Sequence, residues 1–227
     1  MNKRLEAIAR LVMDGRGLAD VGTDHGYLPI WLAQHGYGGK LFASDVNPLP
    51  LSAAIRSAQE AGLEKRIHFA LSDGLEQTPP DEIDTIVIAG MGGDLICDIL
   101  DRAEWCMDPR YSLLLQPMTK AEVLRYWLCN NGFVLTEEKL VRDGAFLYQV
   151  ISARFQENMK LSDAELFSGA FTNLQRDPLA GEWLELLCAR FDKELSGLSA
   201  AAKQMPEKIE LCREILRELA EMKGHLP

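Results

Sequence analysis

Two hydrophobic patterns alternate along the first part of the chain. Short runs of apolar residues are typical of strands, and between them apolar residues recur every three or four positions, as on one face of a helix. The run Ile86–Ala89 is apolar throughout, which predicts a strand covered on both faces. The predicted strands are Gly17–Val21, Lys40–Ser44, Ile67–Ala70, Thr85–Ala89 and Ser112–Gln116. The helices predicted between them are Leu28–Gln34, Leu49–Ala61, Asp94–Arg102 and Ala121–Asn130.

The order of these elements predicts the fold class. Strands that alternate with helices favour right-handed crossovers and a mostly parallel sheet, so we expect an α/β fold. Two further strand-like runs, Phe133–Val141 and Phe146–Arg154, flank the tripeptide Arg142-Asp143-Gly144. Asp-Gly between apolar runs indicates a hairpin, which we expect at the edge of the sheet. Before the first strand, an amphipathic helix is expected with one face made of Leu5, Ile8, Ala9 and Val12.

The pattern changes after about Gln156, where strand-like runs end. Ser162 followed by Glu165 forms a capping-box sequence that opens a helix, and Pro178 and Pro206 stand where helices can begin. Apolar stripes at heptad spacing then predict a helical hairpin packed as a short antiparallel coiled coil. We therefore expect a catalytic domain over residues 1–156 and a helical domain over residues 157–227. The stripes consist of Trp183, Leu187 and Leu195, and of Ile209, Cys212, Leu216 and Leu219.

Charge and cysteine content narrow the class of protein. The 24 basic and 34 acidic residues give a net charge of −10, which argues against a protein that coats nucleic acid by charge alone. No apolar run is long enough to cross a membrane, and the start of the chain does not resemble a secretory signal. The five cysteines are widely spaced and do not pair with histidines at metal-ligand spacing. We expect a cytoplasmic protein with reduced thiols and no metal site.

Glycines and carboxylates follow three consecutive predicted strands. Gly22 and Gly26 follow the first strand, Asp45 ends the second, and Asp73 follows the third. Ligands of open α/β sheets bind at the carboxyl ends of the strands, where an acid after the second strand can accept hydrogen bonds from ribose hydroxyls. Taken singly, these residues also fit a plain loop or a helix N-cap at Asp45. Together they predict a site for a nucleoside-containing cofactor.

The first turn argues against a dinucleotide. The fingerprint G-x-G-x-x-G requires glycines where this chain has Asp24 and Tyr27. A diphosphate would also meet the Asp24 carboxylate at a helix N-terminus, where an anion should find free N–H groups. An acidic turn instead suits a positively charged cofactor, such as a sulfonium that carries an α-amino group.

These motifs resemble those of a known enzyme family. The strings are Asp20-Val21-Gly22-Thr23-Asp24-His25, Ala43-Ser44-Asp45, Ser72-Asp73-Gly74 and Ile88-Ala89-Gly90-Met91-Gly92-Gly93. In this order, over residues 1 to about 155, they resemble class I S-adenosylmethionine-dependent methyltransferases, and more narrowly the bacterial tRNA (adenine-22-N1)-methyltransferases. The resemblance implies a Rossmann-like sheet, S-adenosylmethionine as cofactor, and methyl transfer to N1 of adenine 22 in tRNA. A C-terminal helical coiled coil also fits that family.

The resemblance also implies a role for each cofactor residue. Asp20, Gly22, Thr23 and Asp24 would hold the methionine end of the cofactor. Asp45 would bind the ribose, and Val46 would pack on the adenine. Asp73 and Gly74 would read the adenine edge, and Ala89, Gly90 and Met91 would border the transferable methyl group.

The end of the fourth strand indicates the reaction class. Gly90, Met91 and Gly92 supply backbone groups and open space but no side chain that could grip an exocyclic amine. Methylation of a ring nitrogen suits such a site, since its lone pair is already nucleophilic and catalysis can rest on positioning. Asp24 is the candidate carboxylate to steady a cationic product. The alternative is a flexible loop before a helix that Asp94 caps.

Substrate contacts are less constrained by the sequence. His25 and Tyr27 could stack on a base or simply pack, and Gln116 and Pro117 could line the substrate side. Basic residues could contact phosphates, and we expect such residues around the mouth of the pocket. A small metabolite as substrate, or a binding module without activity, stays open as an alternative, as do the oligomeric state and the tRNAs recognised. The basic candidates are Lys3, Arg4, Arg10 and Arg142.

Overall fold

The computed structural model describes residues 1–227 except residues 14, 157–158 and 201–204. The chain divides into two compact units. The first comprises residues 1–137 and 141–159, and the second comprises residues 138–140 and 160–227. The predicted boundary at 156/157 borders residues outside the described part of the chain, so it stays a prediction.

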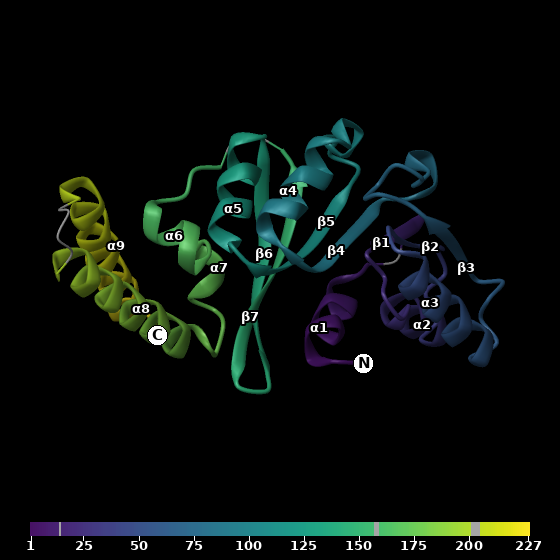
Figure 1. The fold of residues 1–227 in the computed structure, drawn as a ribbon, viewed down its shortest axis with the longest axis horizontal. Coiled ribbons are helices and arrows are strands. Elements are labelled where there is room, and N and C mark those ends of the chain that lie inside the picture. The colour runs from purple at the N-terminus through teal and green to yellow at the C-terminus, as the bar shows by residue number, and fades with distance from the viewer. Residues whose placement is uncertain (14, 157–158, 201–204) are drawn as a thin grey trace. The chain divides into compact units, whose positions relative to one another are not determined.

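A seven-stranded sheet forms the centre of the first unit (Figure 1). The strand order is β3-β2-β1-β4-β5-β7-β6. Pairing is parallel from β3 through β5, and β7 joins β5 in antiparallel orientation. This confirms the predicted fold class. The strands are β1 (Gly17–Val21), β2 (Lys40–Asp45), β3 (Ile67–Leu71), β4 (Thr85–Gly92), β5 (Ser112–Thr119), β6 (Phe133–Asp143) and β7 (Phe146–Phe155).

Helices connect the strands and cover the sheet. The chain moves outward from β1 to β3 and in the opposite direction from β4 to β5, so right-handed crossovers place the two sets of helices on opposite faces. The helix before β1 packs with its apolar side against the buried core, where Ile8 and Leu18 are fully enclosed. The helices are α1 (Lys3–Leu11), α2 (Tyr27–Gln34), α3 (Pro48–Glu60), α4 (Gly93–Asp101) and α5 (Ala121–Asn130), with 3-10 turns at Pro80–Glu82 and Glu104–Cys106.

Two local predictions require correction. Strands β4 and β5 run three residues beyond their predicted ends, to Gly92 and Thr119, because they continue to pair past an irregularity near Met91. Asp94 does not cap the following helix. Gly92 occupies the N-cap without a side-chain hydrogen bond, and the Asp94 carboxylate pairs with the Lys120 ammonium instead.

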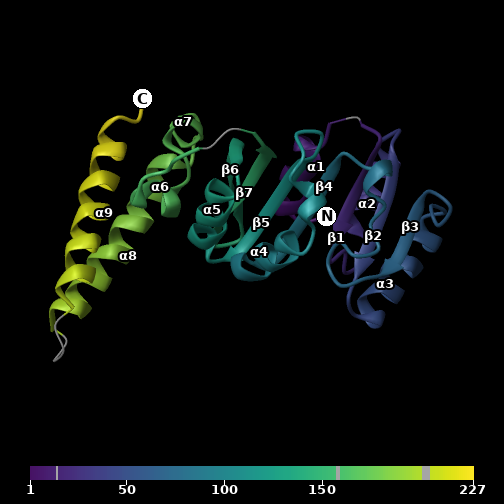
Figure 2. The ribbon, with the colours of Figure 1, turned by 90° about the horizontal axis from the view of Figure 1, so that it is seen from above.

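The second unit consists mainly of helices (Figure 2). It has its own apolar core. Its elements are α6 (Asp163–Ser168), α7 (Phe171–Leu174), α8 (Ala180–Ala200) and α9 (Pro206–Gly224). The capping box at Ser162 and the start of a helix at Pro206 are confirmed. Helices α8 and α9 run side by side in opposite directions. No helix among the described residues is long and apolar enough to span a membrane.

The predicted stripes of this hairpin are partly wrong. Cys212 and Leu219 are buried as expected, but Ile215 rather than Leu216 is the buried residue between them. On α8, Leu187 is buried as expected, and the residue buried one turn before it is Leu184. Trp183, its predicted counterpart, is half-buried and donates a hydrogen bond from Nε1 to the Ser168 carbonyl at 3.0 Å. At one position on each helix, the buried residue is therefore a direct neighbour of the predicted one.

Candidate active site

A cavity of about 570 Å³ opens at the carboxyl ends of the parallel strands in the first unit. It lies where β1 and β4 are neighbours and the chain leaves the sheet in opposite directions, the place where open α/β sheets bind ligands. All the residues expected to bind a cofactor line this cavity. They are Asp20, Gly22, Thr23, Asp24, Asp45, Val46, Asp73, Gly74, Ala89, Gly90 and Met91.

Of the remaining predicted site residues, some line the cavity and others do not. Arg4, Tyr27 and Gln116 line the cavity. Gly92 does not line it, and neither do the other substrate candidates, which are Lys3, Arg10, His25, Pro117 and Arg142. Further lining residues were not predicted. Two of them, Leu95 and Ile99, lie four residues apart on α4, a spacing that could have indicated a common face. The others are Asn2, Leu5, Val21, Leu28, Asn47, Ser72 and Met118.

Asp20 is a buried carboxylate at the end of β1. Its side chain accepts a hydrogen bond of 2.6 Å from the Thr23 hydroxyl, and 5% of the residue is exposed. Burial raises the pKa of Asp20 to about 6; the Thr23 hydrogen bond opposes this rise, and the nearby Asp45 carboxylate adds to it. A positive charge beside Asp20 would therefore relieve an unfavourable burial.

Asp45 ties the end of β2 to the first turn. Its carboxylate accepts hydrogen bonds from the backbone N–H of Asn47 at 2.8 Å and of Asp24 at 3.4 Å. The carbonyl of Ser44 accepts from the N–H groups of Gly22 and Thr23 at 2.8 and 2.9 Å. Asp45 is not a helix N-cap, because Asn47 occupies that position of α3. The alternative interpretation of Asp45 is thus wrong.

Asp24 has an unusual backbone conformation. Its φ of 51° lies in the left-handed region, which non-glycine residues seldom adopt and which is often found at functional sites. Its carboxylate is largely exposed, and His25 Nε2 lies 3.6 Å from it. The rings of His25 and Tyr27 stack with their centroids 5.3 Å apart. His25 therefore contacts two residues that line the cavity, although it is not a lining residue itself.

The ends of β4 and β5 form a different wall. Gln116 is 1% exposed, and its Oε1 accepts a hydrogen bond of 3.1 Å from Arg4 Nη1. The Arg4 guanidinium also lies 4.7 Å from the ring centroid of Tyr148, and its Nε lies 3.5 Å from the Asp143 carboxylate. Arg4 was predicted as a phosphate contact. In the structure its guanidinium joins α1 to the cavity wall and to the β6–β7 hairpin, and the phosphate contact stays a prediction.

The cavity is acidic. Among its lining residues, Arg4 is the single basic side chain beside Asp20, Asp24, Asp45 and Asp73, so the expected basic mouth is not found there. Such a set of acceptors fits a cationic ligand better than a phosphate. No group of residues in the described ranges has the makeup of a metal site.

The thiols of Cys97 and Cys106 are poor nucleophiles. Burial raises the pKa of both to about 12, so both stay protonated near neutral pH. A covalent thiol step through either residue is therefore disfavoured.

Comparison with known proteins identifies the family of the sheet-containing region. Residues 1–151 match a family profile described as a methyltransferase domain. The chain belongs to this methyltransferase domain family. This match confirms two predictions: the methyltransferase fold, and the interpretation of the protein as a methyltransferase. The cavity described above lies in the methyltransferase domain.

Relatives extend the similarity beyond the methyltransferase domain. The tRNA (adenine(22)-N(1))-methyltransferase of Bacillus subtilis (strain 168) is 29% identical over 223 residues, covering 97% of this chain and 93% of that protein. The structure of Streptococcus pneumoniae Sp1610 in complex with S-adenosyl-L-methionine is 28% identical, with a TM-score of 0.84 and coverage of 98% and 99% of the two chains. The B. subtilis tRNA methyltransferase TrmK is 27% identical, with a TM-score of 0.80 and coverage of 100% and 97%.

Proposed function

We propose that this chain transfers a methyl group from S-adenosylmethionine to N1 of adenine 22 in tRNA. The observation that carries the proposal is the convergence of all the predicted cofactor residues on one cavity at the strand ends. The site alone supports a methyltransferase that binds a cationic nucleoside. The choice of tRNA and of the N1 atom is supported by similarity to the B. subtilis enzyme over nearly the full length of both chains.

The residues of the cavity fit the cofactor by chemistry and by place. Asp45 is fixed by two backbone N–H groups, which leaves further acceptor positions of its carboxylate for ribose hydroxyls. Val46 is exposed beside it and can cover one face of the adenine, whose edge would meet Asp73 and Gly74. The methionine end, with its cationic amino group, would lie near Asp20, Gly22, Thr23 and Asp24.

When bound, S-adenosylmethionine supplies an electrophilic methyl group on a sulfonium. The chain supplies the surroundings of that group. Ala89, Gly90 and Met91 border the cavity with backbone and one flexible side chain, and we propose that they, with Gly92 behind them, leave room for the acceptor base. We propose that Asp24, which is exposed and held at positive φ, balances a positive charge on the methylated base. Catalysis would rest on positioning and charge balance.

The direct test is nucleoside mass spectrometry of an unmodified tRNA transcript incubated with the chain and S-adenosylmethionine. We expect 1-methyladenosine in the transcript with adenine at position 22 and none in a matched transcript with guanine there. Methyl transfer only to components of a small-molecule extract would favour the metabolite alternative. Cofactor binding without turnover on any of these substrates would favour a binding module.

The helical part of the chain has no assigned chemistry. We propose that residues 157–227 form a second domain, supported by the separate apolar core around Leu184 and Leu219. It could contact folded RNA or mediate self-association. A cytoplasmic location is proposed on the same basis as the substrate, because a tRNA-modifying enzyme must reach tRNA.

A further inference from the structure

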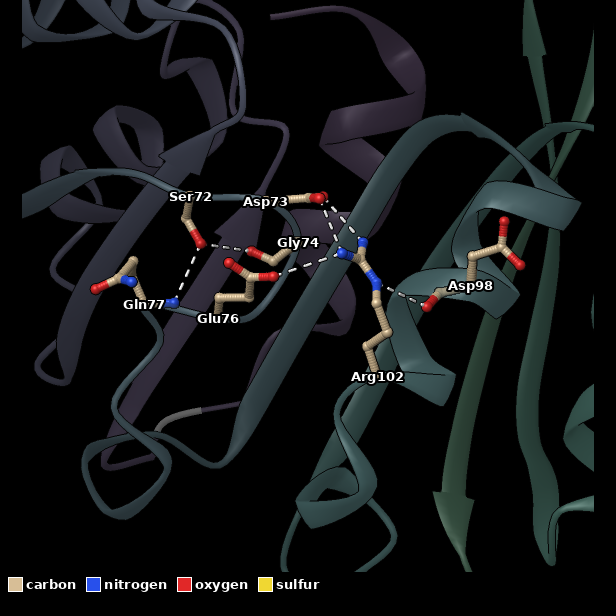
Figure 3. Close-up of polar contacts among 7 residues, drawn as sticks. All are labelled: Ser72, Asp73, Gly74, Glu76, Gln77, Asp98 and Arg102. Atoms are coloured by element: carbon tan, nitrogen blue, oxygen red, sulfur yellow. Dashed lines mark hydrogen bonds and ion pairs between the residues drawn. The ribbon is translucent and has the colours of Figure 1, made fainter.

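Arg102 connects the end of α4 to the loop after β3 (Figure 3). Its Nη1 and Nη2 donate hydrogen bonds to the two carboxylate oxygens of Asp73, at 2.8 and 2.9 Å. Its Nε donates to the Asp98 carbonyl at 3.3 Å, and Nη1 lies 3.6 Å from the Glu76 carboxylate. The guanidinium is thus held by its own helix on one side and by the loop on the other. Such a two-pronged arrangement fixes the plane of the carboxylate as well as its position.

The loop itself holds the backbone around Asp73 but not its carboxylate. The Ser72 hydroxyl donates to the Gly74 carbonyl at 3.1 Å and accepts from the Gln77 N–H at 3.1 Å. The Asp73 side chain is 55% exposed, and the hydrogen bonds that the described residues offer to its carboxylate come from Arg102. Without Arg102, this carboxylate would be free to rotate into solvent.

Gly74 allows the loop to approach α4 closely. Its φ of 59° is in the left-handed region, and a Cβ there would lie 3.0 Å from Ile99 Cγ2 and 3.5 Å from Arg102 Nη2. Ile99, Asp73 and Gly74 line the cavity, whereas Arg102 does not. Arg102 therefore contacts a lining residue, Asp73, from outside the cavity lining.

We propose that Arg102 is a positioning residue that orients the Asp73 carboxylate to accept a hydrogen bond from the amino group of the cofactor's adenine. A carboxylate has about four acceptor positions, of which the two-pronged Arg102 contact uses two. The others stay available for an N–H donor. The inference rests on the proposed function, since it takes S-adenosylmethionine as the ligand. According to this inference, Arg102 allows the site to discriminate between a purine with a 6-amino group and a purine with a 6-oxo group.

Two features of the pair support this role. Its two-pronged geometry fixes the plane of a carboxylate whose residue lines the cavity. The hydrogen bond from Arg102 also holds the pKa of Asp73 below its usual range, so the carboxylate stays an acceptor to a lower pH than an unpaired aspartate would. An ionised, oriented acceptor favours adenine, whose 6-amino group donates, over hypoxanthine, whose 6-oxo group does not.

The test compares two ligands by calorimetry: S-adenosylhomocysteine and S-inosylhomocysteine, which differ in the 6-substituent of the purine and in the hydrogen that hypoxanthine carries on N1. Wild type should prefer the adenosine form by about tenfold or more, as expected for one hydrogen bond to a charged group. Arg102→Met should bring the two dissociation constants within about twofold, and Arg102→Lys should fall between, because a lysine keeps the charge but not the fork. In turnover, Arg102→Met should raise KM for S-adenosylmethionine and leave kcat nearly unchanged.

Two controls separate positioning from folding. Arg110→Met removes another exposed arginine, which pairs with Asp81 and Asp108 and does not line the cavity, and it should keep the wild-type preference. In a double-mutant cycle, Asp73→Asn with Arg102→Met should bind no worse than Asp73→Asn alone, because Arg102 acts through Asp73.

Several results would overturn the inference. An unchanged preference in Arg102→Met, additive losses in the cycle, or a lowered Tm with an unchanged preference would each assign Arg102 a structural role. A wild type that binds both ligands equally would show that Asp73 does not read the amino group. A wild type that binds neither ligand would overturn the proposed function together with this inference.

Discussion

The two sides of the cavity are lined by different kinds of group. At the ends of β1, β2 and β3, carboxylates dominate, and Asp20, Asp45 and Asp73 are each fixed by hydrogen bonds from neighbouring groups. At the ends of β4 and β5, the wall consists of glycine backbone, apolar side chains and the amide of Gln116, to which the Arg4 guanidinium donates a hydrogen bond. One side can hold a ligand by charge, and the other can hold one by shape.

This difference indicates how a methyltransferase can work with few catalytic side chains. The charged side would bind the cofactor tightly in one orientation. The neutral side would leave room for a flat base beside the cofactor. Variants on the charged side should therefore change cofactor affinity. Variants on the neutral side should change turnover of tRNA or stability while leaving cofactor affinity alone.

The largest effect is expected for Asp45→Ala. If Asp45 binds two ribose hydroxyls as proposed, losing this buried carboxylate should weaken S-adenosylhomocysteine binding by on the order of 100- to 1000-fold, from two hydrogen bonds to a charged group. Isothermal titration calorimetry measures this directly. A loss of affinity of less than about tenfold would show that Asp45 contributes little to cofactor binding. It would also weaken the contrast between the two sides.

Asp20→Asn tests whether burial of charge on this side is unfavourable in the ligand-free protein. The pKa of Asp20 is about 6 in the folded chain and 3.8 as its ordinary value, so the folded state binds more protons between these pH values. Stability therefore falls as pH rises through this window, by up to about 3 kcal/mol from about two pKa units. Asparagine keeps an acceptor for the Thr23 hydroxyl and removes the charge.

We expect ligand-free Asp20→Asn to be more stable than wild type at pH 7 to 8, with the gap closing toward pH 4. Urea unfolding across this range is the measurement. If the difference in free energy of unfolding between the variant and wild type is independent of pH, then burial of the ionised Asp20 carboxylate does not destabilise the fold.

Gly93→Ala tests the close packing on the neutral side. A Cβ at Gly93 would overlap the carbonyl oxygen of Lys120 and lie 2.9 Å from its carbonyl carbon, so backbone must move. Overpacking of this kind should cost roughly 1–3 kcal/mol of folding free energy. Gly92→Ala is the matched control, because its Cβ would meet only the Thr119 hydroxyl, at 3.4 Å. Equal Tm values for the two variants would contradict the packing argument.

Arg4→Met should have the smallest effect of these variants. It should change turnover of tRNA and leave cofactor affinity nearly unchanged. Removing the hydrogen bond from Arg4 to Gln116 should lower kcat/KM for tRNA by about tenfold, the value of one charge-assisted hydrogen bond. The dissociation constant for S-adenosylhomocysteine should stay within about twofold of wild type. Arg56→Met, at an exposed position of α3 that does not line the cavity, serves as the control. A parallel loss of cofactor affinity would show that the two sides are coupled.

The residues that sequence reasoning placed correctly share one property. Asp20, Asp45 and Asp73 stand at the ends of consecutive strands, and in a parallel sheet the order of elements alone brings such positions together. Pairs that depend on where a long side chain reaches could not be predicted this way. Arg102 and Asp73 are 29 residues apart, and Arg4 and Gln116 are 112 apart, and no periodicity relates the members of either pair.

The helical hairpin shows a second limit of prediction from pattern. Ile215 and Leu216 are adjacent apolar residues, so hydrophobicity alone does not decide which of them faces the core. In the structure Ile215 is buried, and Leu216 is half-buried beside it. Both fit a heptad, so the register depends on the shape of the facing helix, which a one-dimensional pattern does not contain.

The raised pKa of Asp20 also affects how the cavity handles charge. A carboxyl group with a pKa of about 6 is about half protonated near pH 6, so in mildly acid solution the ligand-free cavity is less negative than its four aspartates suggest. A cation that binds beside Asp20 lowers this pKa again, and the carboxyl group releases its proton to solvent. Around pH 6, Asp20 is therefore expected to give up a proton when the cavity takes in a cation and to recover one when the cation leaves.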